Sequence, residues 1–320
     1  MMRLPSIKNL TYLLALEEHQ NFNRAAKACN VSQSTLSAGI QNLEEQLGCQ
    51  LIERDNKSFL FTATGLEAIN RARDIVNHTR DLVEFVQNQA SPMSGEVRLG
   101  CIPTIAPFLL SKVVTQANDA YPELKLLLRE DTTQNLLAML ERGELDLILL
   151  ALPVDTKGFH TMRLGKDPFS QVMHKELFEK WGQDADPKKL PDRSVFLLEK
   201  EHCLTDHAVS ACHLTDSTKI NPFAATSLHT LVQMVNAKLG TTFLPQLAID
   251  AGILTGTDLV ASRMADDNAY REIGLVWRQT SSRIRTYRRL GELIAKELPE
   301  SLRYARFPST KTPARGRRFV

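Results

Sequence analysis

The sequence predicts an α/β protein with a small helical head, one long connecting helix and a larger domain of alternating strands and helices. Three observations predict this fold. Apolar residues recur at helical spacing through the first 47 residues, a longer helical repeat follows, and from residue 95 short apolar runs alternate with helical segments. The length of 320 residues suits two or three domains, each with its own core. We place the domain boundaries at 1–65, 66–90, 91–302 and 303–320.

The composition excludes several classes of protein. The chain is 43% hydrophobic and 24% charged, which is ordinary for a soluble globular protein. It has no apolar run long enough for a transmembrane helix and no signal peptide, so we expect a cytoplasmic protein without membrane contact. Five cysteines in a reducing compartment do not predict a structural disulfide framework. A pair that forms there would be catalytic or redox-sensing.

The net charge of +2 hides an uneven distribution. Residues 1–90 carry a net charge of −1, residues 91–302 carry −3, and the tail at 303–320 carries +6. Because nucleic-acid binding domains are usually basic, the whole-chain value by itself argues weakly against such a partner. The tail contains Pro308, Pro313 and Gly316 and few apolar residues, so we expect it to be disordered. It is either a solvated end or an accessory contact to DNA.

The head is predicted to contain three short helices. Residues 7–18 carry an amphipathic pattern, and residues 23–29 form a short alanine-rich segment. Ser32 is a good N-cap for the third helix because its hydroxyl accepts an otherwise unpaired backbone N–H, and Gly48 is a typical helix end. The third helix is expected to bury one stripe, formed by Leu36, Ile40, Leu43 and Leu47.

The start of the third helix is suited to reading DNA. Short amide and hydroxyl side chains at this end of a recognition helix reach base edges in the major groove. Two short strands, at 51–54 and 59–62, form a wing that places Arg54 and Lys57 near phosphates or the minor groove. The pattern predicts a winged helix-turn-helix that binds double-stranded DNA, and the alternative is a small bundle with a solvated polar face. The predicted DNA-binding residues are Ser32, Gln33, Ser34, Ser37 and Arg54.

The long connecting helix is predicted to be a dimerisation element. Thr64 and Glu67 fit a capping box at its start. We expect no other part of the chain to cover its apolar seam, so a second copy would cover it and a dimer would present two heads to a pseudo-palindromic site. A hinge is expected at 91–95. The seam consists of Ile69, Ala72, Val76, Thr79, Val83 and Val86.

The larger domain is predicted to be a two-subdomain α/β unit. Alternating strands and helices imply parallel strands with crossover helices. Such folds bind ligands in the crevice between subdomains, at the carboxyl ends of strands. We assign subdomain I to about 95–167 and 271–300, and subdomain II to about 168–270. Strands are expected at 96–100, 124–130, 145–150, 194–198, 242–244 and 273–277, and helices at 107–121 and 133–142.

Three segments of the head resemble the LysR-type transcriptional regulators. They are Phe22–Ala26, Val31–Ser37 and Ile40–Gly48, and the match continues through Thr62–Gly65. Ile52 stands where the family usually has Phe, and it keeps an apolar side chain there. The resemblance implies a homodimer or homotetramer that binds promoter operators and contacts RNA polymerase. It also implies a regulatory domain similar to periplasmic binding proteins.

A pair of cysteines carries the chemistry of the larger domain. Cys203 and Cys212 lie nine residues apart in an expected polar loop, and His202 directly precedes the first of them. A cationic or hydrogen-bonding neighbour favours the thiolate, which peroxide oxidises to a sulfenic acid and then, with a second thiol, to a disulfide. The residues alone leave two alternatives open. The pair is inert, or it binds Zn, Cu or Fe together with His207 and either His202 or His213.

This region resembles the peroxide-sensing members of the LysR family. The resemblance rests on the His-Cys pair, the second cysteine nine residues later, and the segments Ile102–Pro107, Ala225–Leu228 and Arg271–Val276. It implies that Cys203 is the peroxidatic cysteine and Cys212 the resolving one, and that a thiol reductant such as glutaredoxin or thioredoxin resets the disulfide. No cofactor and no bound metal are implied. The peroxide-binding residues would be Thr104, Thr133, His202 and Arg271.

The resemblance implies a regulator of oxidative-stress genes and not an enzyme, but other hypotheses stay open. One is a LysR-type regulator for a small organic effector or metal, in which the cysteine pair is incidental. A thiol peroxidase and a solute-binding protein are the others, and the DNA-reading head argues against both. Glu201 and Thr205 stand where the peroxide sensors commonly have Gly and a basic residue, and each is expected to alter either reactivity or the barrier to loop refolding. The remaining cysteines, Cys29, Cys49 and Cys101, are expected to be structural thiols.

Overall fold

The computed structural model describes residues 4–54, 59–87, 92–181, 190–199, 201, 203–214 and 216–304, and for Arg54, Glu84 and Gln87 it describes the backbone alone. The chain forms two compact units. One contains the N-terminal 89 residues with residues 280–282, and the other contains the rest. Among the described residues, no helix is long and apolar enough to cross a membrane.

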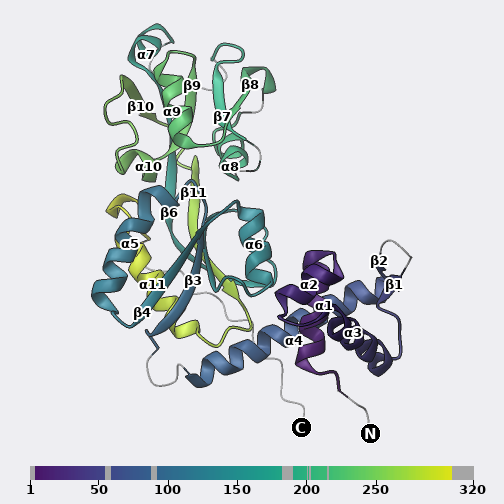
Figure 1. Ribbon diagram of the computed structural model, residues 1–320. Helices are drawn as coiled ribbons and strands as arrows, with labels where there is room; N and C mark the ends of the chain where they lie inside the picture. The colour runs from purple at the N-terminus through teal and green to yellow at the C-terminus, as the bar shows by residue number, and fades with distance from the viewer. Residues whose placement is uncertain are drawn as a thin grey trace, which may run out of the picture. The chain divides into compact units, whose positions relative to one another are not determined.

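The N-terminal unit has the predicted winged helix-turn-helix (Figure 1). Its third helix begins after the Ser32 cap, whose hydroxyl accepts the Thr35 N–H, and ends at Gly48 with φ +68°. Three residues of the predicted stripe are buried, but Leu47 is 42% exposed because it occupies the last turn of the helix, beyond the packed core. The elements are α1 (Ile7–His19), α2 (Phe22–Ala28), α3 (Gln33–Leu47), β1 (Ile52–Arg54) and β2 (Phe59–Phe61).

The long helix α4 (Ala63–Gln87) corrects two expectations. Its first turn is capped by Thr62 and not by Thr64, since the Thr62 hydroxyl accepts the Gly65 N–H at 2.9 Å. The start of the seam is also not free, because Ile69 and Ala72 are buried in the core of the head. The later part of α4 does expose apolar side chains, namely Ile75, Leu82, Val83, Phe85 and Val86.

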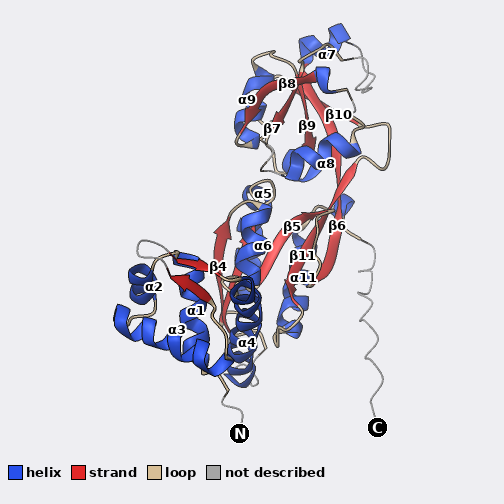
Figure 2. Cartoon of the chain, turned by 90° about the vertical axis from the view of Figure 1, so that its right-hand side faces the viewer, coloured by secondary structure: helices blue, strands red, loops and turns tan. Residues whose placement is uncertain are grey.

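The larger unit is built on a nine-stranded sheet with the order β4-β3-β5-β11-β6-β9-β7-β8, and β10 pairs with β6 (Figure 2). Helices α5, α6 and α11 belong to subdomain I, and α7 to α10 belong to subdomain II. The elements of subdomain I are β3 (Gly95–Cys101), α5 (Ala106–Ala120), β4 (Leu124–Glu130), α6 (Thr133–Glu141), β5 (Leu147–Leu152), β11 (Tyr270–Arg278) and α11 (Ile284–Glu297). Those of subdomain II are α7 (Lys175–Trp181), β7 (Val195–Leu198), α8 (Cys203–Ala211), β8 (Ile220–Ala225), α9 (Leu228–Asn236), β9 (Thr241–Pro245), α10 (Gln246–Asp250) and β10 (Leu259–Arg263).

The strand β6 (Phe159–His174) joins the two subdomains, and the sequence reading did not anticipate it. It pairs with β11 from Phe159 to Pro168 and with β9 from Phe169 onward. The change of partner falls at the position where we place the end of subdomain I. One continuous strand thus belongs to both subdomains, so the side chains at the change of partner lie where the subdomains meet.

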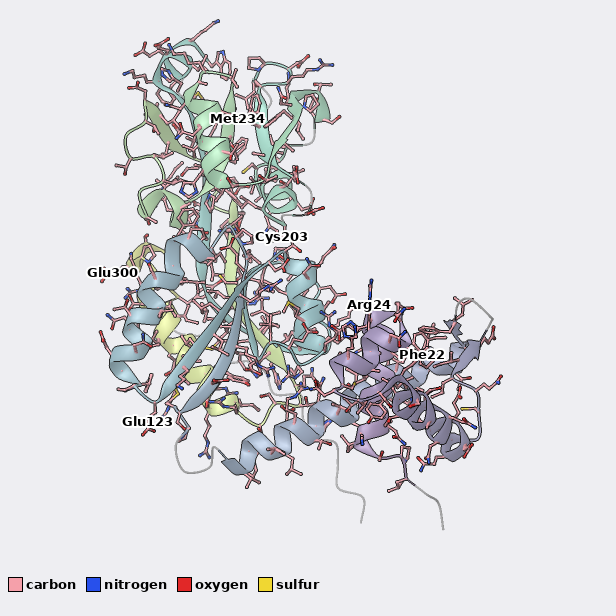
Figure 3. All side chains as sticks on the ribbon, viewed as in Figure 1. Phe22, Arg24, Glu123, Cys203, Met234 and Glu300 are labelled. Atoms are coloured by element: carbon pink, nitrogen blue, oxygen red, sulfur yellow. The ribbon has the colours of Figure 1, made fainter. Side chains whose placement is uncertain are left out.

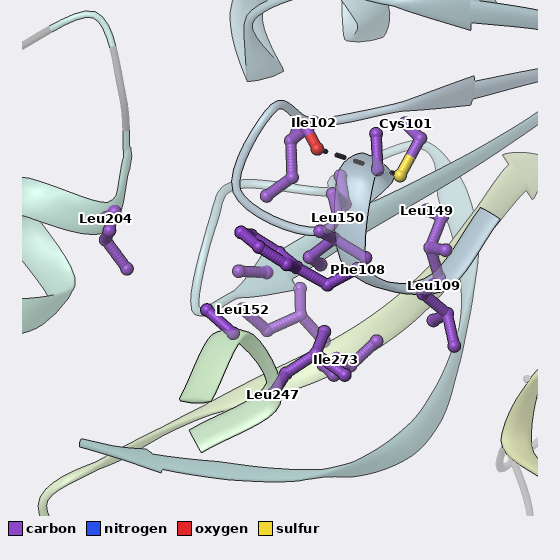
Figure 4. Packing of buried hydrophobic residues seen from close by; sticks show 14 of the residues in the cluster. Cys101, Ile102, Phe108, Leu109, Leu149, Leu150, Leu152, Leu204, Leu247 and Ile273 are labelled. Atoms are coloured by element: carbon purple, nitrogen blue, oxygen red, sulfur yellow. Dashed lines mark hydrogen bonds between the residues drawn. The ribbon is translucent and has the colours of Figure 1, made fainter. Parts of the chain in front are cut away.

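One hydrophobic core runs through both subdomains. Every residue of β5 is buried, as expected for a strand covered on both faces. Figure 4 shows Phe108, Leu150 and Ile273 of subdomain I packed together, with Leu247 of α10 close by. Leu204 of α8 belongs to the same core, and this anchors the helix that carries the cysteines.

The described part of the predicted tail is attached to subdomain I. Arg303 forms an isolated bridge with Gly165, and the Tyr304 hydroxyl donates a hydrogen bond to Glu272. These two residues therefore extend the folded domain by two positions past its predicted end. Residues 305–320 lie outside the described residues.

Candidate redox site and DNA-binding head

The segment between the two cysteines is a helix, and the prediction of a polar loop is wrong. Helix α8 begins at Cys203 and buries one face through Leu204, His207 and Ala208. Their spacing of three and one places them on one face of a helix, and this periodicity could have indicated the helix. The Thr205 hydroxyl donates to the Leu198 carbonyl at 2.7 Å, which ties the first turn of α8 to the end of β7.

Cys203 lies where the two subdomains meet (Figure 3). Its sulfur is 3.2 Å from the hydroxyl of Thr133, the first residue of α6. The two side chains come from different subdomains, so the contact depends on how the subdomains pack. Both belong to one small pocket, and the other lining residues are Ile102, Pro103, Thr104, Thr132 and Glu201.

The pKa of the Cys203 thiol is set by opposing effects. Burial raises it above the ordinary value, while the Thr133 hydrogen bond and the charge of Arg271 lower it. Asp206, one turn along α8, raises it further. Burial disfavours the thiolate, and a positive charge or a donated hydrogen bond favours it. The pocket therefore offsets part of the cost of ionising a buried thiol.

Arg271 is held behind this pocket with no exposed surface. Its Nη1 donates to the Thr104 hydroxyl at 2.8 Å, and its Nη2 donates to the Thr104 carbonyl at 3.0 Å. Since the Thr104 oxygen accepts from the guanidinium, its own O–H remains as a donor. Thr133 donates to sulfur and keeps lone pairs that accept. The pocket thus holds one hydroxyl donor and one hydroxyl acceptor beside Cys203.

Thr133→Val tests the hydrogen bond to sulfur. Valine keeps the shape but removes the donor, so we expect the pKa of Cys203 to rise and its thiolate fraction at pH 7 to fall by up to about tenfold, the effect of one pKa unit. Alkylation of Cys203 by iodoacetamide, followed by peptide mass spectrometry across pH, measures this. Thr115→Val is the control, because that hydroxyl donates to Ser111 within α5. Equal rates at pH 7 for the Thr133 variant and the wild type would contradict the assigned role.

Cys212 is buried and lies just after α8 with helical hydrogen bonding. Its side chain is 1% exposed, its N–H donates to the Ala208 carbonyl, and burial raises the pKa of its thiol to about 12. Nine helical residues advance about 13 Å and about two and a half turns, which puts the two cysteines on opposite faces. Cα atoms beyond about 7 Å cannot be bridged without backbone movement, and both thiols are free here.

The two described histidines that we considered as metal ligands, His207 and His213, have other polar partners. Nε2 of His207 lies 2.8 Å from the Pro153 carbonyl, and Nε2 of His213 lies 3.0 Å from Asp266. Within the described residues, no group of three His, Cys, Asp or Glu side chains is arranged to hold a metal ion. His202, which we predicted as a pocket residue, lies outside the described residues.

The remaining cysteines lie away from the pair along the chain. Cys101 is fully buried at the end of β3, and burial raises the pKa of its thiol well above the ordinary range. Its thiol donates to the Ile102 carbonyl (Figure 4). Cys29 and Cys49 are partly exposed in the head.

The predicted DNA-reading residues gather at the start of α3. Gln33 and Ser34 are exposed and Ser37 is partly exposed, whereas the Ser32 hydroxyl is used as the cap. Arg54 ends β1 beside the predicted wing turn, and Lys57 lies outside the described residues.

Glu44 has a structural role that the sequence analysis did not predict. Its carboxylate accepts the backbone N–H groups of Leu51 and Ile52 at 2.8 and 3.1 Å. It thereby ties the third helix to the first strand of the wing.

Comparisons with known proteins agree with this architecture. Residues 7–66 match the family "Bacterial regulatory helix-turn-helix protein, lysR family", and residues 90–299 match "LysR substrate binding domain". The HTH-type transcriptional regulator EstR of Acinetobacter baylyi is 36% identical over 282 residues, covering 88% of this chain and 93% of that protein. The DNA-binding transcriptional dual regulator OxyR of Escherichia coli K12 is 35% identical over 300 residues, covering 90% and 94%. The reduced regulatory domain of OxyR2 from Vibrio vulnificus is 56% identical with a TM-score of 0.63, covering 64% of this chain and 97% of that one.

A winged helix-turn-helix, a long helix with an exposed apolar face and a two-subdomain α/β unit together define a DNA-binding transcriptional regulator. The two family matches identify the family of regulators. This chain belongs to the LysR family of transcriptional regulators.

Proposed function

We propose that the protein senses hydrogen peroxide and regulates oxidative-stress genes through Cys203 and Cys212. The observation that carries the proposal is the placement of the Cys203 sulfur, 3.2 Å from the Thr133 hydroxyl and in the same pocket as Thr104, whose hydroxyl accepts from Arg271. The similar proteins also support the proposal, because they include OxyR and a protein called hydrogen peroxide-inducible genes activator. His202 is proposed as a further pocket residue on the resemblance alone.

The first chemical step is oxidation of Cys203. Its thiolate attacks one peroxide oxygen, an S–O bond forms as the O–O bond breaks, and the second oxygen leaves as hydroxide that takes up a proton. Hydrogen peroxide both donates and accepts hydrogen bonds, which matches the donor at Thr104 and the acceptor at Thr133. The charge of Arg271 favours the thiolate and the departing hydroxide.

The second step joins the two cysteines. Cys212 loses its proton and attacks the sulfenic sulfur of Cys203, and water leaves as the disulfide forms. This requires α8 to unwind, because the helix holds the two sulfurs on opposite faces. The buried Leu204 and the bond from Thr205 to Leu198 oppose unwinding, so the helical and disulfide states form a two-state switch.

The output of the switch is proposed to be a change in DNA binding. The exposed apolar side chains of α4 are proposed to pair with a second copy, giving a homodimer or homotetramer with two heads on one operator. RNA polymerase and a thiol reductant such as glutaredoxin or thioredoxin are the further proposed partners. The proposed base-reading residues are Gln33, Ser34 and Ser37, while Ser32 positions the helix and Arg54 is assigned to phosphate.

One equivalent of hydrogen peroxide added to the reduced protein tests the mechanism directly. Because no Lys or Arg lies between Cys203 and Cys212, one tryptic peptide contains both, and we expect it to become lighter by two hydrogen atoms as the disulfide forms. In Cys212→Ser, dimedone should instead capture a sulfenic acid at Cys203. Two free thiols in the wild type after peroxide treatment would reject the redox mechanism. Continuous peroxide consumption with excess reductant, at a rate independent of DNA, would favour a thiol peroxidase.

A second candidate function is regulation by a small organic effector. A cavity of about 380 Å³ lies beside α8, which is within the size range of small-molecule sites. Its lining includes Leu152, Pro153, His207, Tyr270 and Glu272. A metabolite that raised the melting temperature and changed DNA binding of Cys203→Ser would support this candidate.

A further inference from the structure

Behind the pocket lies a buried ion pair whose carboxylate has no part in the chemistry above. Asp167 of β6 and Arg271 of β11 are direct partners in the antiparallel register, and neither side chain has exposed surface. Nε of Arg271 donates to Oδ2 of Asp167 at 2.9 Å. Because directly opposed residues project from the same face of a sheet, the strand register brings the two charges together.

The hydrogen bond between Nε of Arg271 and Asp167 determines where the rest of the guanidinium lies. The group is planar with its donors in a fixed fork, so fixing one edge fixes the plane. Both remaining nitrogens then reach Thr104, at 2.8 and 3.0 Å. Asp167 therefore binds the Nε of Arg271, and Thr104 binds its two terminal nitrogens.

Both carboxylate oxygens of Asp167 accept a hydrogen bond. Its second oxygen, Oδ1, accepts the N–H of Leu247 at 2.8 Å, in the first turn of α10. One oxygen thus binds the arginine and the other binds subdomain II. An asparagine has only one acceptor oxygen, so it can satisfy one of these donors and presents an N–H to the other.

We propose that Asp167 is a positioning residue that holds Arg271 against Thr104 and within electrostatic reach of the Cys203 sulfur. The inference rests on the proposed function, since it assigns Asp167 to the same redox site. The anion that raises the pKa of Cys203 is Asp206, whereas Arg271 lowers it. Asp167 is thus assigned to act through the arginine, whose buried charge would lose its ion-pair partner without it.

Asp167→Asn gives the test, read out by iodoacetamide alkylation of Cys203 across pH. If Asp167 positions Arg271, the profile moves to higher pH and the rate at pH 7 falls about tenfold, the equivalent of one pKa unit. The plateau rate at high pH stays that of the wild type. If Arg271 keeps its place without Asp167, its unopposed charge moves the profile to lower pH. A lower or unchanged midpoint in the folded variant would overturn the proposal.

Asp146→Asn is the matched control. Asp146 is also a buried carboxylate, and it bonds to the Arg98 guanidinium at 2.6 Å. It precedes β5, whereas Thr104 follows β3, and these parallel strands place the two residues at opposite ends of the sheet. We expect the control to lower stability without moving the Cys203 profile. An equal shift in the control would indicate a general loss of packing and overturn the proposal.

A second comparison, between Arg271→Gln and the double variant that also carries Asp167→Asn, does not require the Asp167→Asn single variant to fold. In Arg271→Gln the arginine is already lost, so adding Asp167→Asn should leave the Cys203 profile where it is. A further tenfold change at pH 7 between these two proteins would show that Asp167 acts independently and would overturn the proposal. Because iodoacetamide reports the thiolate and not peroxide chemistry, failure here is distinguishable from failure of the proposed peroxide sensing.

Discussion

Cys203→Ser should abolish the response of the protein to peroxide. A serine hydroxyl does not form the reactive anion in this pocket and cannot form a disulfide, so the first oxidation and every later step are lost. We expect the variant to stay locked in one DNA-binding state. The measurement is transcription from a promoter fragment that the wild-type protein binds, with and without peroxide.

The matched control is Cys49→Ser, which removes a partly exposed thiol from the head and leaves the pair intact. It should respond to peroxide as the wild type does. A normal response by Cys203→Ser would instead favour regulation by an organic effector, with the cysteine pair incidental. A lost response in both variants would indicate that DNA binding itself had failed.

Cys212 should be almost unreactive while the protein is reduced and folded. Burial raises the pKa of its thiol to about 12 from an ordinary value near 9. The rise of about three pKa units lowers the thiolate fraction at pH 7 about a thousandfold. Alkylation of Cys212 should therefore be at least about a thousandfold slower in the folded protein than in urea, as measured by peptide mass spectrometry. Above the ordinary pKa near 9 the thiol in urea is already ionised, while the thiolate fraction of the folded protein still rises, so the protection should weaken only above that pH.

The protection of Cys212 has a consequence for the order of oxidation. Cys203 must react first, and Cys212 attacks only after α8 opens. A Thr205→Ala variant, which lacks the bond to Leu198, serves as a comparison because its α8 is held less firmly. Its Cys212 should be alkylated faster than that of the wild type, with the rate in urea unchanged. Similar rates for folded and unfolded wild-type protein would show that Cys212 is not protected by the helix.

The sequence by itself determined the parts of the protein that depend on local signals. The N-cap at Ser32, the terminator at Gly48 and the apolar repeat between them specify α3 with little reference to other segments. The continuous apolar run of β5 likewise identifies a strand buried on both faces. The cysteine spacing singled out Cys203, and the family resemblance named Thr133 as a pocket residue, but the 3.2 Å contact between them comes from the structure.

The tertiary structure alone decided how the site works. Cys203 and Cys212 lie at the two ends of a helix. This helix is held because Leu204 packs into a core that both subdomains share. The pairing of Asp167 with Arg271 follows from the register of two strands more than 100 residues apart in sequence. The periodicity within one strand does not predict its register with a distant strand. The register depends on which faces of the two strands are buried when they pair.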